Sequence, residues 1–257
     1  MTHWTEGMFL DSPEVFEVTM RRRIEGADEE VEQLRSLLAD HGLEPETALD
    51  VACGIGRHAV ELAAADVDVH GIDLSPEYVE RARDRASEAG VAGRASFEVA
   101  DMRRLGERTD RYDLVANMWT AFGYFDEETN ERIADGFRER VGEGGALVME
   151  LVNKEGMMTD YQESSAQRDD DLLFTERREY TPATGRMETT LTLFREAESE
   201  QAYESLGELS WDLRLYSPAE LRRLLERAGF TEVSLYGGLD GAALERDSSQ
   251  FVVVAEP

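Results

Sequence analysis

Short apolar runs alternate with amphipathic stretches between residues 47 and 151. Runs with the length of buried strands lie at 48–52, 67–72, 96–100, 112–116 and 145–151. Helical signals separate them at 57–65, from Ser75 to about Ala89, and at 127–140. Because strands that alternate with helices form a parallel sheet covered on both faces, this part of the chain predicts an α/β fold.

The N-terminal part of the chain predicts helix. Ser12 and Pro13 form a start signal, since serine caps helices and proline favours the first helical position. Apolar residues recur at helical spacing over 31–38, and the pattern ends at Gly42. We therefore expect one helix across 11–42.

After Asn153 the period changes to the alternation that is typical of strands. Strands are expected at 172–180, 186–195 and 206–216, then a helix from the capping box Ser217–Glu220 to Gly229, then strands at 231–236 and 250–255. The pattern predicts a doubly wound sheet domain across 45–154 and 217–257, an antiparallel insertion across 155–216, and a helical segment across 1–44.

The charge of the chain is strongly acidic. It has 56 acidic and 27 basic residues, a net charge of -29, and a single lysine, Lys154. Such charge repels itself at low salt, whereas at molar salt the Debye length falls to about 3 Å and screens most of the repulsion. This composition resembles that of proteins from salt-accumulating archaea. Since no basic patch is visible, we expect no nucleic-acid partner.

The cysteine and histidine positions and the hydropathy of the chain bear on disulfides, metal sites and membrane spans. Cys53 is the single cysteine, which excludes an intramolecular disulfide and a thiolate zinc site, and the four histidines show no metal-ligand spacing. We therefore expect no metal. The longest apolar runs, such as 145–152, are shorter than a membrane span, and residues 1–10 show no secretory signal. A cytoplasmic chain without a membrane partner is the expectation.

The candidate chemistry begins at a glycine loop after the first predicted strand. Asp50, Ala52, Gly54 and Gly56 recur at every second position, and a helix follows. Glycines let the backbone turn sharply and approach a ligand closely, and the helix beyond offers N–H groups to an anion. Cys53 lies within this loop and is interpreted as a small packing residue.

Polar residues also end the next three predicted strands. Asp73-Leu74, Asp101-Met102 and Asn117-Met118 occupy these positions, and the aromatic residues Trp119, Phe122 and Tyr124 follow the last of them. Open α/β sheets bind ligands at the carboxyl ends of their strands. We expect these residues to line one crevice, where a carboxylate can accept from ribose hydroxyls or an adenine amino group and the aromatic residues can contact a substrate.

These motifs resemble those of the class I S-adenosylmethionine-dependent methyltransferases that act on small molecules. The family's first motif is Asp/Glu-x-Gly-x-Gly-x-Gly, and here Ala52 replaces the first glycine, which is tolerable if the backbone there is extended. The resemblance spans residues 47–257 and includes 112–124, 228–230 and 247–249.

The resemblance implies S-adenosylmethionine as cofactor and S-adenosylhomocysteine as product, bound by a seven-stranded Rossmann-like sheet. It implies that Asp50 and the loop backbone hold the methionine end, that Asp73 holds the ribose and Asp101 the adenine, and that Asn117 lies near the sulfonium. Residues 1–44 would form a helical lid, and the lid and the insertion would be walls of an acceptor pocket. The insertion could instead be a homodimer surface.

The implied reaction is direct in-line methyl transfer to a nitrogen, oxygen or carbon of a small molecule. The acceptor, its atom and any catalytic residue stay open. One alternative is a nicotinamide-dependent oxidoreductase, because Gly54-x-Gly56-x-x-Ala59 fits that fingerprint, although Asp50 and Asp101-Met102 disfavour it. Another is a protein that binds the cofactor without transferring methyl. Nucleic-acid methyltransferases are disfavoured, since no proline follows Asn117 and Cys53 lies away from the fourth strand.

Overall fold

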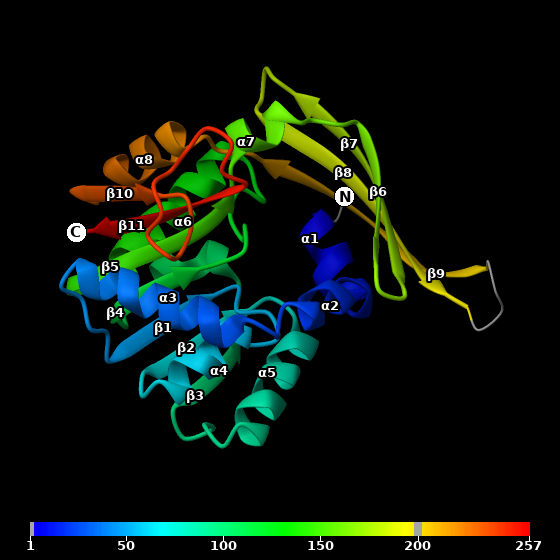
Figure 1. Cartoon of the computed structure of the whole chain (residues 1–257). Coiled ribbons are helices and arrows are strands. Elements are labelled where there is room, and N and C mark those ends of the chain that lie inside the picture. Colours follow the sequence, from blue (N-terminus) through cyan, green and yellow to red (C-terminus); the bar gives the residue numbers. More distant parts are fainter. Residues whose placement is uncertain (1–2, 198–201) are drawn as a thin grey trace.

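Two separate β-sheets organise the computed structural model, which describes residues 3–197 and 202–257 (Figure 1). The larger sheet has seven strands in the order β10-β11-β5-β4-β1-β2-β3. Its strands are β1 (Thr47–Val51), β2 (Asp68–Asp73), β3 (Ala95–Val99), β4 (Tyr112–Asn117), β5 (Val141–Val152), β10 (Glu232–Tyr236) and β11 (Gln250–Glu256). β1 to β5 run parallel and β11 is antiparallel to both of its neighbours. The predicted doubly wound Rossmann-like sheet is confirmed.

Helices cover both faces of this sheet because successive strand residues point to opposite sides. Ala48 faces the cluster formed with α3 (Ala27–Asp40), α4 (Arg57–Ala64) and α5 (Pro76–Glu88). Leu49 faces the cluster formed with α6 (Glu127–Arg140) and α8 (Pro218–Arg227). The capping box of α8 is present as predicted: the Ser217 hydroxyl accepts from the Glu220 N–H, and the Glu220 carboxylate accepts from the Ser217 N–H.

The N-terminal segment differs from the prediction of a single helix over 11–42, which is wrong. It consists of α1 (Trp4–Glu6), the π-helical turn η1 (Gly7–Asp11), α2 (Pro13–Arg22) and then α3. The break lies between Arg22, where α2 ends, and Gly26, the left-handed residue with a φ of +99° that precedes the first residue of α3. Ser12 makes no capping hydrogen bond, although Pro13 does begin α2.

The second sheet contains β6 (Ser164–Asp169), β7 (Leu172–Thr181), β8 (Arg186–Glu196) and β9 (Tyr203–Arg214), all antiparallel in chain order. The sequence pattern predicted the last three strands. It missed β6, because this strand is polar and largely exposed, and it also missed the short helix α7 (Lys154–Thr159). Leu191 and Leu193 of β8 and Leu209 of β9 pack with Met8 and Val15. The first helices therefore lie between the two sheets (Figure 1).

The expected domain limits at residues 44, 154 and 216 stay a prediction. Within residues 3–197 and 202–257, no helix combines the length and hydropathy of a membrane span. Over the same residues, no group of three or more histidine, cysteine or acidic side chains is arranged to hold a metal ion.

Candidate functional site

The loop between β1 and α4 contains three left-handed residues. Ala52 has a φ of +60°, Gly54 of +55° and Gly56 of +75°. An extended backbone, the condition under which alanine would be tolerable here, is not met, and alanine is held in this left-handed conformation at a cost of roughly 1–2 kcal/mol. A Cβ on Gly56 would lie 2.8 Å from Cβ of Ala82. The absence of a side chain at Gly56 therefore lets α5 pack against the loop. Gly56 is not among the residues that line the cavity formed by this loop and the neighbouring strand ends.

Asp73 connects the end of β2 to this loop. Its Oδ2 accepts from the Gly54 N–H over 2.8 Å, and its Oδ1 accepts from the Ser75 N–H over 2.9 Å. Burial raises the pKa of the Asp73 carboxyl to about 6, although these backbone hydrogen bonds oppose the rise. Ser75 caps α5 by accepting from the Tyr78 N–H, so Asp73 is left to face the cavity.

Asp101 lies at the end of β3 and caps the 3-10 turn η2 (Met102–Glu107). Its Oδ1 accepts from the Arg103 N–H over 2.9 Å, and the Arg103 guanidinium forms an ion pair with it. Burial alone would raise the pKa of Asp101, but the hydrogen bonds from Arg103 outweigh it and lower the pKa. Asp101 is therefore a carboxylate at neutral pH.

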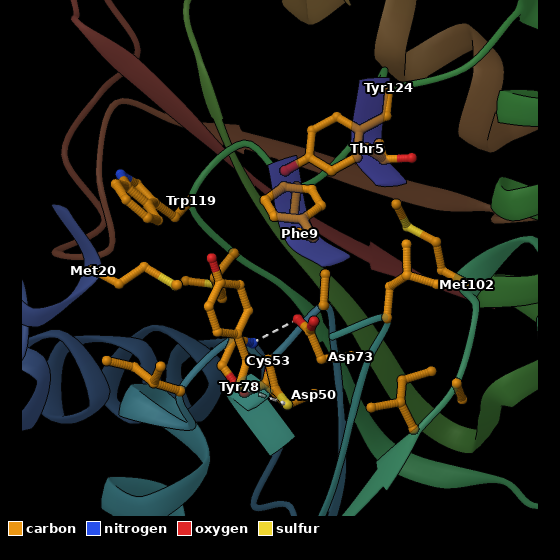
Figure 2. A pocket seen from close by; sticks show the side chains of 18 of the residues that line it. Thr5, Phe9, Met20, Asp50, Cys53, Asp73, Tyr78, Met102, Trp119 and Tyr124 are labelled. Atoms are coloured by element: carbon orange, nitrogen blue, oxygen red, sulfur yellow. Dashed lines mark hydrogen bonds between the residues drawn. The ribbon is translucent and has the colours of Figure 1, made fainter. Parts of the chain in front are cut away.

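These strand ends meet in one cavity, which we call the inner cavity (Figure 2). Of the residues predicted from sequence, it is lined by Asp50, Ala52, Cys53, Gly54, Asp73, Leu74, Asp101, Met102, Met118, Trp119 and Tyr124. Asp50 and Asp73 lie across the cavity from the aromatic rings of Phe9, Trp119 and Tyr124 (Figure 2). Three aspartates from three successive strands thus share one space.

Two further predicted residues do not line this cavity. Asn117 is fully buried, and its Nδ2 donates to the carbonyls of Val51 and Ala121, so it fastens the turn after β4 to β1. Phe122 is 1% exposed and packs in the core beneath the sheet, 5.5 Å from the ring of Tyr216. We correct the substrate prediction for Phe122, because the turn directs its ring inward.

A second and larger cavity, the outer cavity, adjoins the inner one. Counting space that is open to solvent, it measures about 1760 Å³ and the inner cavity about 930 Å³. Phe9, Phe16, Trp119 and Tyr124 line both. Its walls come from the N-terminal helices and from the inward faces of β6 to β9, and all three tryptophans of the chain, Trp4, Trp119 and Trp211, line it.

Trp119 stands between the two cavities in a strained turn. Trp119 and Thr120 have φ values of +54° and +60°, which are uncommon for bulky or β-branched residues. Oε2 of the buried Glu150 accepts from the Trp119 N–H over 3.2 Å, and its backbone carbonyl accepts from the Thr120 N–H. The Trp119 ring stacks on Phe16 with centroids 5.5 Å apart. Sequence reasoning missed Glu150, which lies within β5 between Met149 and Leu151, in a run that was predicted as an apolar strand.

Two buried residues at the start of α4 complete the inner cavity, and a half-buried glutamate on α3 contacts both of them. Arg57 and His58 open α4, line the cavity and both contact Oε2 of Glu30 on α3. Burial lowers the pKa of His58 and so favours the neutral ring. The hydrogen bond with Glu30 acts in the opposite direction but does not outweigh burial. Sequence reasoning missed Arg57, whose only signal is its place directly after the glycine loop.

Known proteins resemble this chain in sequence. Residues 48–145 match the family model described as a methyltransferase domain. The 27-O-demethylrifamycin SV methyltransferase of Amycolatopsis mediterranei (strain S699) is 46% identical over 68 residues, 26% of this chain and 25% of that protein. The dTDP-3-amino-3,4,6-trideoxy-alpha-D-glucopyranose N,N-dimethyltransferase of Streptomyces venezuelae is 28% identical over 145 residues, 55% of this chain and 57% of that protein. The matches thus span about a quarter to just over half of these relatives.

Solved structures resemble the chain over nearly its whole length. An S-adenosylmethionine-dependent methyltransferase from Clostridium acetobutylicum ATCC 824 has a TM-score of 0.79 at 13% identity and covers 95% of this chain and 96% of its own. CalS10 from Micromonospora echinaspora, an amino pentose methyltransferase solved with S-adenosylmethionine, has a TM-score of 0.65 at 20% identity and covers 93% and 96%. Residues 48–145 therefore match a methyltransferase domain, and the whole chain has the Rossmann-like fold that solved S-adenosylmethionine-dependent methyltransferases share.

Proposed function

We propose that the chain transfers the methyl group of S-adenosylmethionine to a nitrogen, oxygen or carbon of a small molecule. The observation that carries the proposal is the convergence of Asp50, Asp73 and Asp101 on an inner cavity that opens, past Trp119 and Tyr124, into an aromatic outer cavity. The domain match and the methyltransferase relatives support this reaction class, as does the S-adenosylmethionine bound to CalS10.

The hydrogen-bond acceptors of the inner cavity fit this cofactor. Oδ2 of Asp50 is sealed from solvent and has no hydrogen-bond partner within residues 3–197 and 202–257, so it is suited to an ammonium group. Asp73 would hold the ribose hydroxyls, and Asp101 the adenine amino group with Leu74 and Met102 as apolar contacts. S-adenosylhomocysteine is the product that would remain in the same place.

The outer cavity would hold the methyl acceptor. The lid and the second sheet wall it, which supports the pocket interpretation of the insertion; a homodimer surface on the outer face stays open. Tyr124 contacts both cavities, and burial raises the pKa of its hydroxyl well above its ordinary value, so it is a hydrogen-bond donor to the acceptor and not a base. Trp119 and Tyr124 are the substrate contacts that we retain.

The bound cofactor supplies an electrophilic methyl group on a sulfonium. The protein's own task is to hold the acceptor atom in line with that methyl group and to exclude water, and such positioning can contribute ~7–11 kcal/mol to rate acceleration. In the transfer the sulfur–methyl bond breaks as the acceptor–methyl bond forms, and the electron pair of the broken bond stays on sulfur. The acceptor's proton, where it has one, passes to solvent on the open side of the outer cavity.

Transfer of radiolabelled methyl tests the function. The chain is incubated with methyl-labelled S-adenosylmethionine and a mixed pool of small metabolites, including the dTDP-amino sugar named for the Streptomyces venezuelae relative. Label in an organic product supports the proposal. Binding of S-adenosylhomocysteine without any labelled product would indicate a non-catalytic cofactor-binding protein. Thermal stabilisation by NAD and not by S-adenosylhomocysteine would indicate the oxidoreductase alternative.

The charge supports a further proposal about the setting in which the chain works. We propose that it comes from a salt-accumulating archaeon and works in the cytoplasm, because a net charge of -29 with one lysine suits a concentrated salt solution. A small-molecule acceptor, and not a nucleic acid or a membrane, is the partner that the acidic charge and the aromatic outer cavity favour.

A further inference from the structure

Arg57 is a buried cation that the cofactor assignments above leave without a role. It is the first residue of α4, it is 5% exposed, and it lines the inner cavity together with Asp50. Its position is electrostatically unfavourable, since the N-terminus of a helix carries partial positive charge and disfavours a cation. An arginine buried there calls for a compensating negative charge.

Protein groups satisfy one side of the guanidinium. Nη1 of Arg57 donates to Oε2 of Glu30 and, over 3.4 Å, to the carbonyl of Arg23. Nη2 is sealed from solvent and has no partner in the part of the chain that the structure describes. Glu30 also binds the ring of His58, so its carboxylate serves two partners and leaves Nη2 of Arg57 without a hydrogen bond among the described residues.

Asp50 carries the opposite charge, and it too has a buried side-chain atom without a hydrogen-bond partner. Its side chain is 2% exposed, and its Oδ2 lacks a partner among the described residues. The two charges act on each other, because the Arg57 guanidinium opposes the rise in the pKa of Asp50. They nevertheless form no ion pair with each other in the described structure, where Asp50 lies on β1 and Arg57 pairs with Glu30.

Two buried opposite charges that face one cavity without touching complement a zwitterion. We propose that Arg57 binds the carboxylate of the cofactor's amino-acid end while Asp50 binds its ammonium group, so that the two residues together recognise an α-amino acid moiety. Glu30 is then a positioning residue, which orients the guanidinium and links the lid to this end of the site. This inference rests on the proposed function.

Calorimetric binding of two ligands to two variants tests it without any turnover. The ligands are S-adenosylhomocysteine and its decarboxylated analogue, which differ only in the carboxylate. The variant Arg57→Met removes the guanidinium, and Arg57→Lys keeps a charge. Arg35→Met, on the exposed side of α3, is the matched control for the loss of one positive charge in an acidic chain.

The wild type and Arg35→Met should bind S-adenosylhomocysteine at least tenfold more tightly than the decarboxylated analogue. Arg57→Met should bind both ligands equally, and Arg57→Lys should keep part of the preference. The ratio of the two affinities isolates the contact with the carboxylate, since a general structural defect weakens both ligands alike. If Arg57→Met keeps the wild-type preference, the inference is wrong while the proposed function stands. If the wild type binds neither ligand, both are wrong.

Discussion

The N–H of Gly54 donates to Oδ2 of Asp73 over 2.8 Å, so the glycine loop after β1 is tied to the tip of β2. This hydrogen bond makes the loop conformation depend on the same carboxylate that would hold the ribose. A single residue thus shapes one part of the cavity and lines another.

The variant Asp73→Ala should therefore lose S-adenosylhomocysteine binding almost completely, by at least a hundredfold, because the ligand contact and the loop anchor disappear together. Isothermal titration calorimetry gives the affinity. Asp68→Ala is the control. Asp68 begins β2, at the opposite end of the strand from Asp73, and this variant should bind normally because Asp68 is exposed and pairs with Arg94. Undiminished affinity in Asp73→Ala would refute the site assignment.

The left-handed backbone at Ala52 gives a second prediction. Replacing it with glycine relieves roughly 1–2 kcal/mol of strain and costs about 0.5–1 kcal/mol of extra chain entropy. Ala52→Gly should therefore leave the free energy of unfolding unchanged or slightly higher in urea titrations. Ala82→Gly, in the interior of α5, should lower it by about 1 kcal/mol. An equal loss in both variants would contradict the assigned backbone conformation.

The buried carboxyl of Asp50 predicts a dependence of stability on pH. Burial raises its pKa from 3.8 to about 7, against the opposing charge of Arg57. The folded chain thus holds this proton more tightly than the unfolded chain does, so the stabilisation is present at low pH and is lost as pH rises through about 7.

Asp50→Asn cannot ionise and escapes that loss. Without cofactor, its free energy of unfolding relative to wild type should rise between pH 4 and pH 8 by up to ~4 kcal/mol, since one pKa unit corresponds to ~1.4 kcal/mol. Urea unfolding at both pH values measures it. A difference that does not change with pH would exclude a raised pKa at this position.

Tryptophan emission should distinguish the two cavities. Trp119 lines both, whereas Trp4 and Trp211 line the outer cavity and not the inner one. S-adenosylhomocysteine should change the emission of the wild type and of Trp211→Phe, but most of that change should vanish in Trp119→Phe. A response that persists in Trp119→Phe would mean that the ligand binds outside the inner cavity.

The net charge of -29 predicts that salt stabilises the fold. Raising KCl from 0.1 M to about 1 M shortens the Debye length from about 10 Å to about 3 Å and should weaken the repulsion between carboxylates. The melting temperature should rise clearly over this range. Sucrose at matched osmolality is the control, because it does not screen charge. A melting temperature that is insensitive to KCl would count against the proposed saline setting.

Local interactions explain what could be predicted from the sequence. The limits of α6 and α8 follow from periodicity and capping within the helices themselves, and the strand ends carrying Asp50, Asp73 and Asp101 follow from apolar runs and turns. Their shared cavity follows because parallel strands place their carboxyl ends at one edge of a sheet. Ala59 likewise fits a nicotinamide fingerprint, so the loop motif alone did not separate the two cofactor classes.

The sequence by itself determined the α/β alternation, the glycine loop and the aspartates at the strand ends, because short-range forces fix each of these. Only the tertiary structure decided that Phe122 turns into the core while Trp119 faces the cavities, and that Glu30 holds Arg57. Those outcomes depend on which distant segments pack together, and residues 27 positions apart, such as Glu30 and Arg57, leave no periodic trace of their contact.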